Sequence, residues 1–235
     1  MTFAIAVGVA SAFGVVLFYK MIDLAFTVFY RIPAEHITRS AFVGYRPILT
    51  ALGLLAAAWI WRRFGRGDQG MNVPDVQLAV ARSGGYLRAR PAIARTFASA
   101  VTLGAGASAG SEGPVAVLGS AIGSRVGRIF RFDSSHVTVL VGAGAAAAIA
   151  AAFNAPLAGA FFALEEILGA FSSVAFAPVV VSSVVGAVVS RAFFGNHPAF
   201  PIPREYGFVS SEIVLLFPIL GILCGVVAAL FIKTY

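Results

Sequence analysis

Long apolar runs alternate with short polar breaks along the whole chain. Reading the runs against the breaks predicts helices near residues 2–30, 41–63, 75–83, 88–104, 113–129, 135–151, 156–168, 172–194 and 210–233. A helix needs about 20 apolar residues to cross a bilayer core, and runs of that kind recur from end to end. The pattern therefore predicts a polytopic, all-α membrane protein. No segment has the composition of a soluble domain, so we expect one transmembrane domain over residues 1–235.

Two of the predicted helices, 75–83 and 156–168, are too short to cross a membrane. At about 1.5 Å per residue they cover roughly half of the bilayer or less, which predicts buried half-spanning helices. The segment 194–206 contains prolines and a charged pair, so we expect it to be an exposed loop.

Composition agrees with this membrane interpretation and explains the excess of positive charge. The chain is 59% hydrophobic and 11% charged, with a formal net charge of +7. Its basic residues form short clusters between apolar runs, which is typical of membrane topology rather than of nucleic-acid binding. We therefore expect an integral, multi-pass protein of the plasma (inner) membrane, in contact with lipid and without a nucleic-acid partner.

Three places share one local pattern, in which a polar or glycine residue is followed by proline and an apolar helix. They are GMNVPDV at 70–76, GSEGPVAV at 110–117 and FNAPLAGA at 153–160. Proline is favoured at the first helical position, so each place predicts a helix start. Inside a membrane, the free N–H groups of such a start form an anion site, as in the broken helices of transporters. The alternative is that all three are ordinary helix starts at the membrane interface.

Glu112 is a charged residue within one of these starts. A charge deep in a membrane helix costs about 2.5 to 3.5 kcal/mol, so it indicates function by default. A carboxylate beside a helix N-terminus can occupy the place of a permeating anion, and protonation would free that place. The flanking segments are small and apolar, so we expect Glu112 to be buried rather than a solvent-facing cap.

Glu165 and Glu166 form a second acidic feature inside an apolar run. Adjacent helical residues point about 100 degrees apart, so one carboxylate can be structural while the other passes protons. Two carboxylates also suit a metal site or acid–base catalysis. No histidine lies at a ligand spacing from them, and the chain has no phosphate-loop lysine, HExxH or CxxC. We therefore expect no metal, no cofactor and no enzymatic activity.

With these motifs in order, the sequence resembles the CLC family of chloride channels and proton-coupled chloride transporters. GMNVPDV resembles the family's GSGIPEI segment, GSEGPVAVLGSAIG its GREGP segment, and AAAFNAPLAGAFFALEE the marked stretch that follows. The resemblance implies a bundle of tilted and half-spanning helices that forms one of two inverted repeats. It also implies a homodimer in which each subunit has its own pore.

The resemblance implies roles for particular residues. Glu112 falls at the gating glutamate and external proton site, Glu166 at the internal proton-transfer glutamate of the exchangers, and Glu165 at a structural acidic position. Anion contacts would come from residues around the first two helix starts, namely Met71, Asn72, Val73, Pro74, Ser111, Gly113 and Pro114.

The chain also departs from the family pattern. Ser111 replaces the usual basic residue before the gating glutamate. Met71 stands where chloride-selective members place an anion-coordinating serine, and this resembles the fluoride-exporting branch. The chain corresponds to the first repeat only, so we expect a fragment; the alternative is a pore assembled from half-subunits.

We therefore expect transport of chloride or a similar small anion, coupled to proton antiport through Glu112. The alternatives are a passive anion channel of the same family, a fluoride exporter, and a non-transporting half-subunit.

Overall fold

The computed structural model describes residues 1–36, 39–65, 71–196, 214 and 216–234. By contacts the chain divides into two units, Met1–Ala199 and Phe200–Tyr235. The described residues form helices and turns without a strand, as the sequence predicts. Most of the predicted loop at 194–206 lies outside the described residues. Gly70, in the first predicted helix start, also lies outside them.

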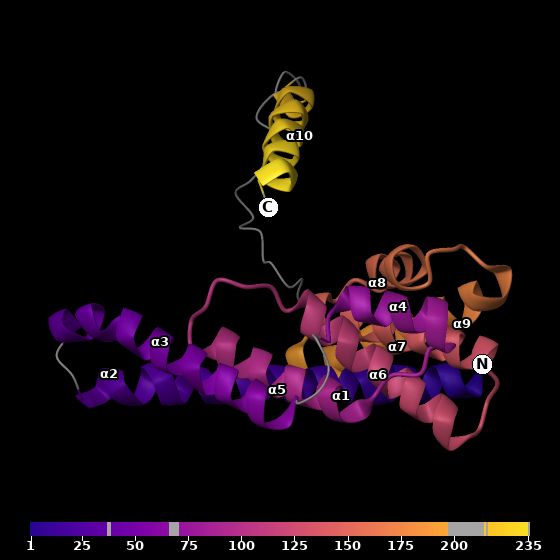
Figure 1. Ribbon diagram of the computed structural model, residues 1–235, viewed down its shortest axis with the longest axis horizontal. Helices are drawn as coiled ribbons and strands as arrows, with labels where there is room; N and C mark the ends of the chain where they lie inside the picture. Colours follow the sequence, from indigo (N-terminus) through magenta and orange to yellow (C-terminus); the bar gives the residue numbers. More distant parts are fainter. Residues whose placement is uncertain (37–38, 66–70, 197–213, 215, 235) are drawn as a thin grey trace. The chain divides into compact units, whose positions relative to one another are not determined.

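The first unit contains helices whose bounds follow the predictions closely (Figure 1). They are α1 (Thr2–Phe26), η1 (Thr27–Arg31), α2 (Ile32–His36), α3 (Arg39–Phe64), α4 (Val73–Ser83), α5 (Ala89–Gly104), α6 (Glu112–Ile129), α7 (Ser134–Phe153), α8 (Pro156–Phe162), η2 (Ala163–Ile167) and α9 (Ser173–Phe194). The second unit contains α10 (Leu216–Thr234). Two segments, η1 and η2, are π-helical turns that the apolar pattern did not predict.

Among the described residues, four helical segments are long and apolar enough to cross a membrane. They are Thr2–Glu35, Ser134–Phe153, Ser173–Phe194 and Leu216–Thr234. In contrast, α4 has 11 residues and α8 has 7, so the expected short helices are present.

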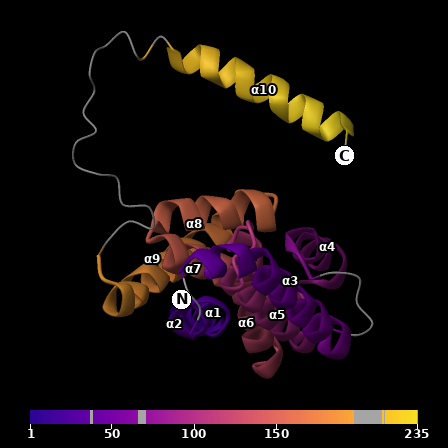
Figure 2. The same cartoon turned by 90° about the vertical axis from the view of Figure 1, so that its left-hand side faces the viewer.

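Helix α7 lies among α1, α6, α8 and α9 (Figure 1, Figure 2). Its residues 140–151 are all buried, although most are alanine or glycine. Small side chains allow helix backbones to approach closely, which favours association where lipid supplies no hydrophobic driving force.

The closest approach joins α6 to α7. A Cβ added at Gly119 would overlap the carbonyl oxygen of Gly144, and one added at Gly144 would overlap the carbonyl oxygen of Gly119. A Cβ at Gly123 would likewise overlap the carbonyl oxygen of Leu140. These glycines therefore fix α6 against α7 backbone to backbone.

Candidate functional site

Helix α4 begins with its own carboxylate folded back onto its first turn. Asn72 is the N-cap, and its backbone N–H donates to Oδ2 of Asp75 over 2.8 Å. The N–H groups of Asp75 and Val76 donate to the carbonyl oxygen of Asn72, while Pro74 has no N–H. Among the described residues no acceptor is present for the N–H of Val73. Among the N–H groups of this first turn, that of Val73 is therefore the one without a described acceptor.

Met71 precedes this cap and has a buried side chain, 6% exposed. It belongs to a core cluster with Val117 of α6 and with Leu164 and Ile167 of η2. The methionine at the predicted anion position is thus part of the core. The same cluster brings together the three segments that carry the predicted site, α4, α6 and η2.

Helix α6 begins in a different way. Ser111 is its N-cap and forms no side-chain capping bond, and Glu112 is the first helical residue. Pro114 is the third residue of α6, whereas Pro74 is the second of α4 and Pro156 the first of α8. All three predicted starts are therefore helix starts, but proline holds the first helical position only in α8.

The side chain of Glu112 is exposed, which contradicts the expectation that its surroundings bury it. The helix after it is buried from Val115 to Val117, as expected. The segment before it is a loop of glycine, alanine and serine, in which Gly106 and 108–110 are exposed. The side chains of glycine, alanine and serine are too small to cover a neighbouring residue. The prediction that Glu112 is buried, which was based on these small residues, is therefore wrong.

Two neighbours position the start of α6. The carboxylate of Glu112 lies so close to Gly110 that a Cβ at position 110 would overlap Oε2. On the other side, the hydroxyl groups of Tyr19 in α1 and Ser111 are 3.3 Å apart. Gly113 has open space where a Cβ would lie. The carboxylate therefore lies beside the backbone at Gly110, in space that a side chain at this position would fill, and no described group forms a hydrogen bond with it.

Glu165 and Glu166 lie in the π-helical turn η2, and both side chains are exposed. The backbone carbonyl of Glu166 accepts a 2.6 Å hydrogen bond from Nε2 of Gln77 in α4. Gln77 was not singled out from the sequence, because nothing local indicates a contact 89 residues away. This bond links the internal acidic pair to the helix that begins at Asn72.

No hydrogen bond or ion pair joins Glu112 to Glu166 among the described residues. Within the same part of the chain, no group of three His, Cys, Asp or Glu side chains could hold a metal ion.

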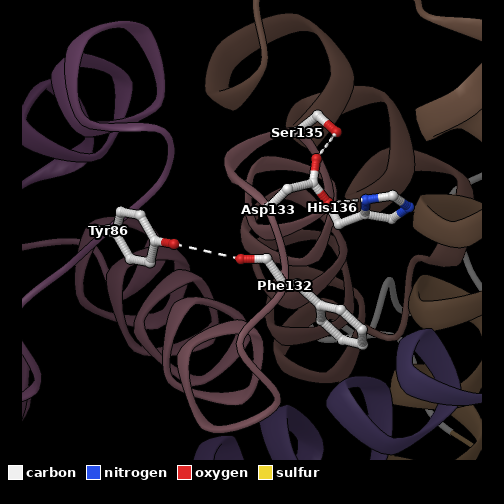
Figure 3. A network of polar contacts seen from close by, with 5 residues as sticks. All are labelled: Tyr86, Phe132, Asp133, Ser135 and His136. Carbon is white, nitrogen blue, oxygen red and sulfur yellow. Dashed lines mark hydrogen bonds and ion pairs between the residues drawn. The ribbon is translucent and has the colours of Figure 1, made fainter.

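A third acidic residue, Asp133, caps the start of α7 on the turn after α6 (Figure 3). Its carboxylate accepts from the hydroxyl of Ser135 and contacts Nδ1 of His136. These two partners lower the pKa of Asp133 to about 2 from its ordinary value of 3.8, with the Ser135 hydrogen bond as the larger cause. Nearby, the hydroxyl of Tyr86 donates to the carbonyl of Phe132, which ties this turn to the α4–α5 loop (Figure 3).

Two curated relatives align with most of this chain. A putative chloride channel protein ClcB-like of Ralstonia nicotianae is 35% identical over 77% of this chain and 43% of its own length. An H(+)/Cl(-) exchange transporter ClcA of Vibrio parahaemolyticus is 33% identical over 79% of this chain and 40% of its own length. The chain thus spans less than half the length of these relatives.

Solved structures share the fold. A slow cyanobacterial Cl-/H+ antiporter superposes with a TM-score of 0.77 at 24% identity, over 97% of this chain and 54% of that one. A CLC-type fluoride/proton antiporter superposes with a TM-score of 0.71 at 23% identity, over 96% of this chain and 54% of that one. The arrangement of full and half-length helices described above is therefore a partial CLC fold.

The sequence profile of one family, described as voltage gated chloride channel, matches residues 53–235. This range contains all three helix starts and the acidic pair. With the fold and the aligned relatives, it shows that the chain is an integral membrane protein of the voltage gated chloride channel family.

Proposed function

We propose that this chain forms part of the pathway of an anion/proton antiporter, with Glu112 as the gate and external proton site. The observation that carries the proposal is the state of the Glu112 carboxylate. It is the first residue of α6, it is exposed, and no described residue forms a hydrogen bond or ion pair with it. A carboxylate that nothing holds is free to leave its place when it is protonated or displaced.

The chemistry follows from the helix start. The first N–H groups of α6 and the positive end of its dipole attract an anion. An ionised Glu112 competes with the transported ion for this attraction, and a neutral Glu112 does not. Protonation and anion binding are thereby linked at one place, which is what exchange requires.

The anion would be bound by backbone groups at the starts of α4 and α6. We assign this role to the segment Met71–Pro74, where the N–H of Val73 is the remaining donor, and to Ser111, Gly113 and Pro114. Because the Met71 side chain belongs to the core, we assign to this residue a backbone contact only.

Glu166 is proposed as the internal proton site. Its side chain is exposed in this chain, and its backbone carbonyl accepts a hydrogen bond from Gln77 of α4. One aligned relative is named an H(+)/Cl(-) exchange transporter, which supports proton exchange, and another is named a putative chloride channel protein, which keeps passive conduction as the alternative. A homodimer in the plasma (inner) membrane is implied by the family resemblance.

Fluoride is a second candidate substrate. Met71 replaces the serine that the resemblance places at this position in chloride-selective members, and a CLC-type fluoride/proton antiporter shares the fold. Flux measurements on the unmodified protein separate the two candidates. Fluoride flux well above chloride flux would identify fluoride as the substrate, and the opposite ratio would identify chloride.

The decisive experiment measures coupling in liposomes. The protein made from the complete reading frame that contains this chain is reconstituted with a chloride gradient, and internal pH is recorded together with chloride. We expect chloride movement to drive protons uphill. Glu112→Gln should abolish the proton movement and leave an anion leak, because a neutral side chain carries no exchangeable charge.

Glu165→Gln is the matched control, since it removes a neighbouring carboxylate to which we assign no proton. It should retain coupling. Chloride flux without any proton movement in the unmodified protein would identify a passive channel instead, and the exchange proposal would be wrong.

A further inference from the structure

A pocket of about 330 Å³ lies beside the start of α6, on the side of α3 and α5. Its walls are mostly apolar, with Trp61 of α3 and Leu103 of α5 among them. Gly110 and Pro114 bring the first turn of α6 to its edge. The pocket is therefore adjacent to Glu112 and shares Pro114 with the proposed pathway, while its other walls come mainly from α3 and α5.

Arg95 of α5 lines this pocket and has an unsatisfied donor. Its Nε is buried, and no described residue accepts a hydrogen bond from it. Neither does Arg95 form an ion pair with a described carboxylate, Glu112 included. A buried donor of a charged group that lacks an acceptor is costly, so an anion that accepts a hydrogen bond from Nε would stabilise this site.

A second polar group converges on the same space. Ser99, one turn after Arg95 on α5, is 9% exposed and also lines the pocket. A hydroxyl and a guanidinium on one helix face can donate to a single small anion. The apolar lining around them would exclude competing water, as in most ligand sites.

We propose that this pocket binds a small monovalent anion, held by Arg95 and Ser99, next to the start of α6. Arg95 thereby supplies the positive charge that Ser111 does not. An anion held here and the carboxylate of Glu112, which lies against Gly110, flank the same helix start.

The lining selects among anions. A site with one cation and mostly apolar walls replaces little of the hydration shell of an anion. The cost of dehydration is therefore small only for an anion that is itself weakly hydrated. Iodide, bromide and thiocyanate meet this condition better than fluoride, and a divalent phosphate would leave a charge unpaired. The pocket therefore favours larger halides, whichever anion the pathway transports.

Trp61 provides a direct readout, because the chain has only two tryptophans, Trp59 and Trp61. Trp59→Phe, made in the protein from the complete reading frame with any tryptophan outside this chain also replaced by phenylalanine, leaves a single fluorophore in the pocket wall. The Trp59→Phe chain in lipid nanodiscs is titrated with sodium iodide at constant ionic strength, with sodium gluconate as the balancing salt. We expect a saturable component of quenching in addition to the linear collisional component. Bromide should displace iodide, and the same concentration of fluoride should not.

Arg95→Gln in this background should weaken the saturable component about tenfold or more, because it removes a charged hydrogen-bond donor. Arg90→Gln, an exposed arginine of the same helix, is the matched control and should leave the midpoint unchanged. Should Arg95→Gln fail to fold, Arg95→Lys and Ser99→Ala serve instead, with a smaller weakening expected from each.

Purely linear quenching of the Trp59→Phe chain would overturn the proposal, as would an equal midpoint in a folded Arg95→Gln chain. Neither measurement uses a gradient or a proton. A failure of proton coupling in liposomes would therefore leave this result standing, and the reverse also holds.

Discussion

Helices α4 and α6 each begin with a polar N-cap, a carboxylate and a proline within five residues. In α4 the acid is Asp75, the third helical residue, and it accepts the N–H of Asn72. In α6 the acid is Glu112, the first helical residue, and no described group holds it. A carboxylate at the third position reaches back to the N-cap, which completes a capping box, whereas one at the first position does not. Position within the first turn therefore separates an acid that accepts a capping hydrogen bond from an acid to which no described group donates.

The largest expected effect comes from disturbing the carboxylate of Glu112 without removing it. Gly110→Ala places a Cβ where Oε2 now lies, and the exposed side chain must move. A displaced rotamer costs about 0.5 to 1.5 kcal/mol, so we expect the exchange rate in liposomes to change about twofold to tenfold. Folding should survive, because the obstacle is the end of a flexible side chain.

Gly44→Ala in α3 is the control for this change, because it adds the same methyl group outside the proposed pathway, at a glycine where nothing lies within 4 Å. It should leave the exchange rate close to that of the unmodified protein. Equal effects of both variants would mean that the position of the carboxylate is not rate-determining.

The next effect tests the other helix start. Asp75→Ala removes the acceptor for the Asn72 N–H, which should destabilise the protein by about 1 kcal/mol. The measurement is the thermal midpoint in detergent. Asp75→Asn keeps an acceptor oxygen and should lose less. A loss of proton coupling in either folded variant, rather than of stability, would contradict the distinction between the two acids.

A smaller effect is expected from the contact that holds the N-cap of α6. Tyr19→Phe removes a part-buried hydroxyl 3.3 Å from that of Ser111. At this length we expect a cost of about 0.5 kcal/mol, the low end for a hydrogen bond. Tyr86→Phe removes a similarly long contact on a remote turn and serves as the reference. If Tyr19→Phe destabilised the protein more than Asp75→Ala, the order of stabilisation proposed for the contacts at the two helix starts would be wrong.

The smallest effect concerns Asp133, the acid at the N-cap of α7. Its folded pKa is lowered to about 2, so its contribution to stability is complete above the ordinary value of 3.8. The contribution is lost as the pH falls from about 4 toward 2, because folding then opposes proton binding. Thermal midpoints of the protein and of Asp133→Asn should converge over this range. A constant difference between them would show that the carboxylate charge is not involved.

The sequence predicted the helices and their starts because proline, capping residues and apolar periodicity are local signals. It predicted half-length helices for the same reason, since α4 is bounded by an Asn72 cap and a glycine in the left-handed conformation, Gly84. The family and the partial CLC fold were also predictable from the three ordered motifs. Residue roles at Glu112 and Glu166 stay predictions.

Other features depend on contacts between distant segments and had no local signal. Gln77 meets the carbonyl of Glu166 across 89 residues, and Tyr19 meets Ser111 across 92. The burial of the Arg95 Nε atom could not be predicted from the sequence, because it depends on the packing of distant segments around the pocket. The exposure of Glu112 was misjudged because glycine and alanine indicate burial inside a helix but offer no cover in a loop.

The reciprocal contact of Gly119 and Gly144 bears on how a gate at Glu112 can work. The carbonyl oxygen of each glycine lies where a Cβ of the other glycine would be. Sliding or rotation of α6 against α7 would therefore bring these oxygens into contact with the backbone of the facing helix. On the proposal that Glu112 is the gate, the moving part is then one side chain and not the helix that carries it. Rotations of an exposed side chain occur in picoseconds to nanoseconds, far faster than movements of whole helices. Exchange would then depend on the position and protonation of one carboxylate, without any sliding of α6 against α7.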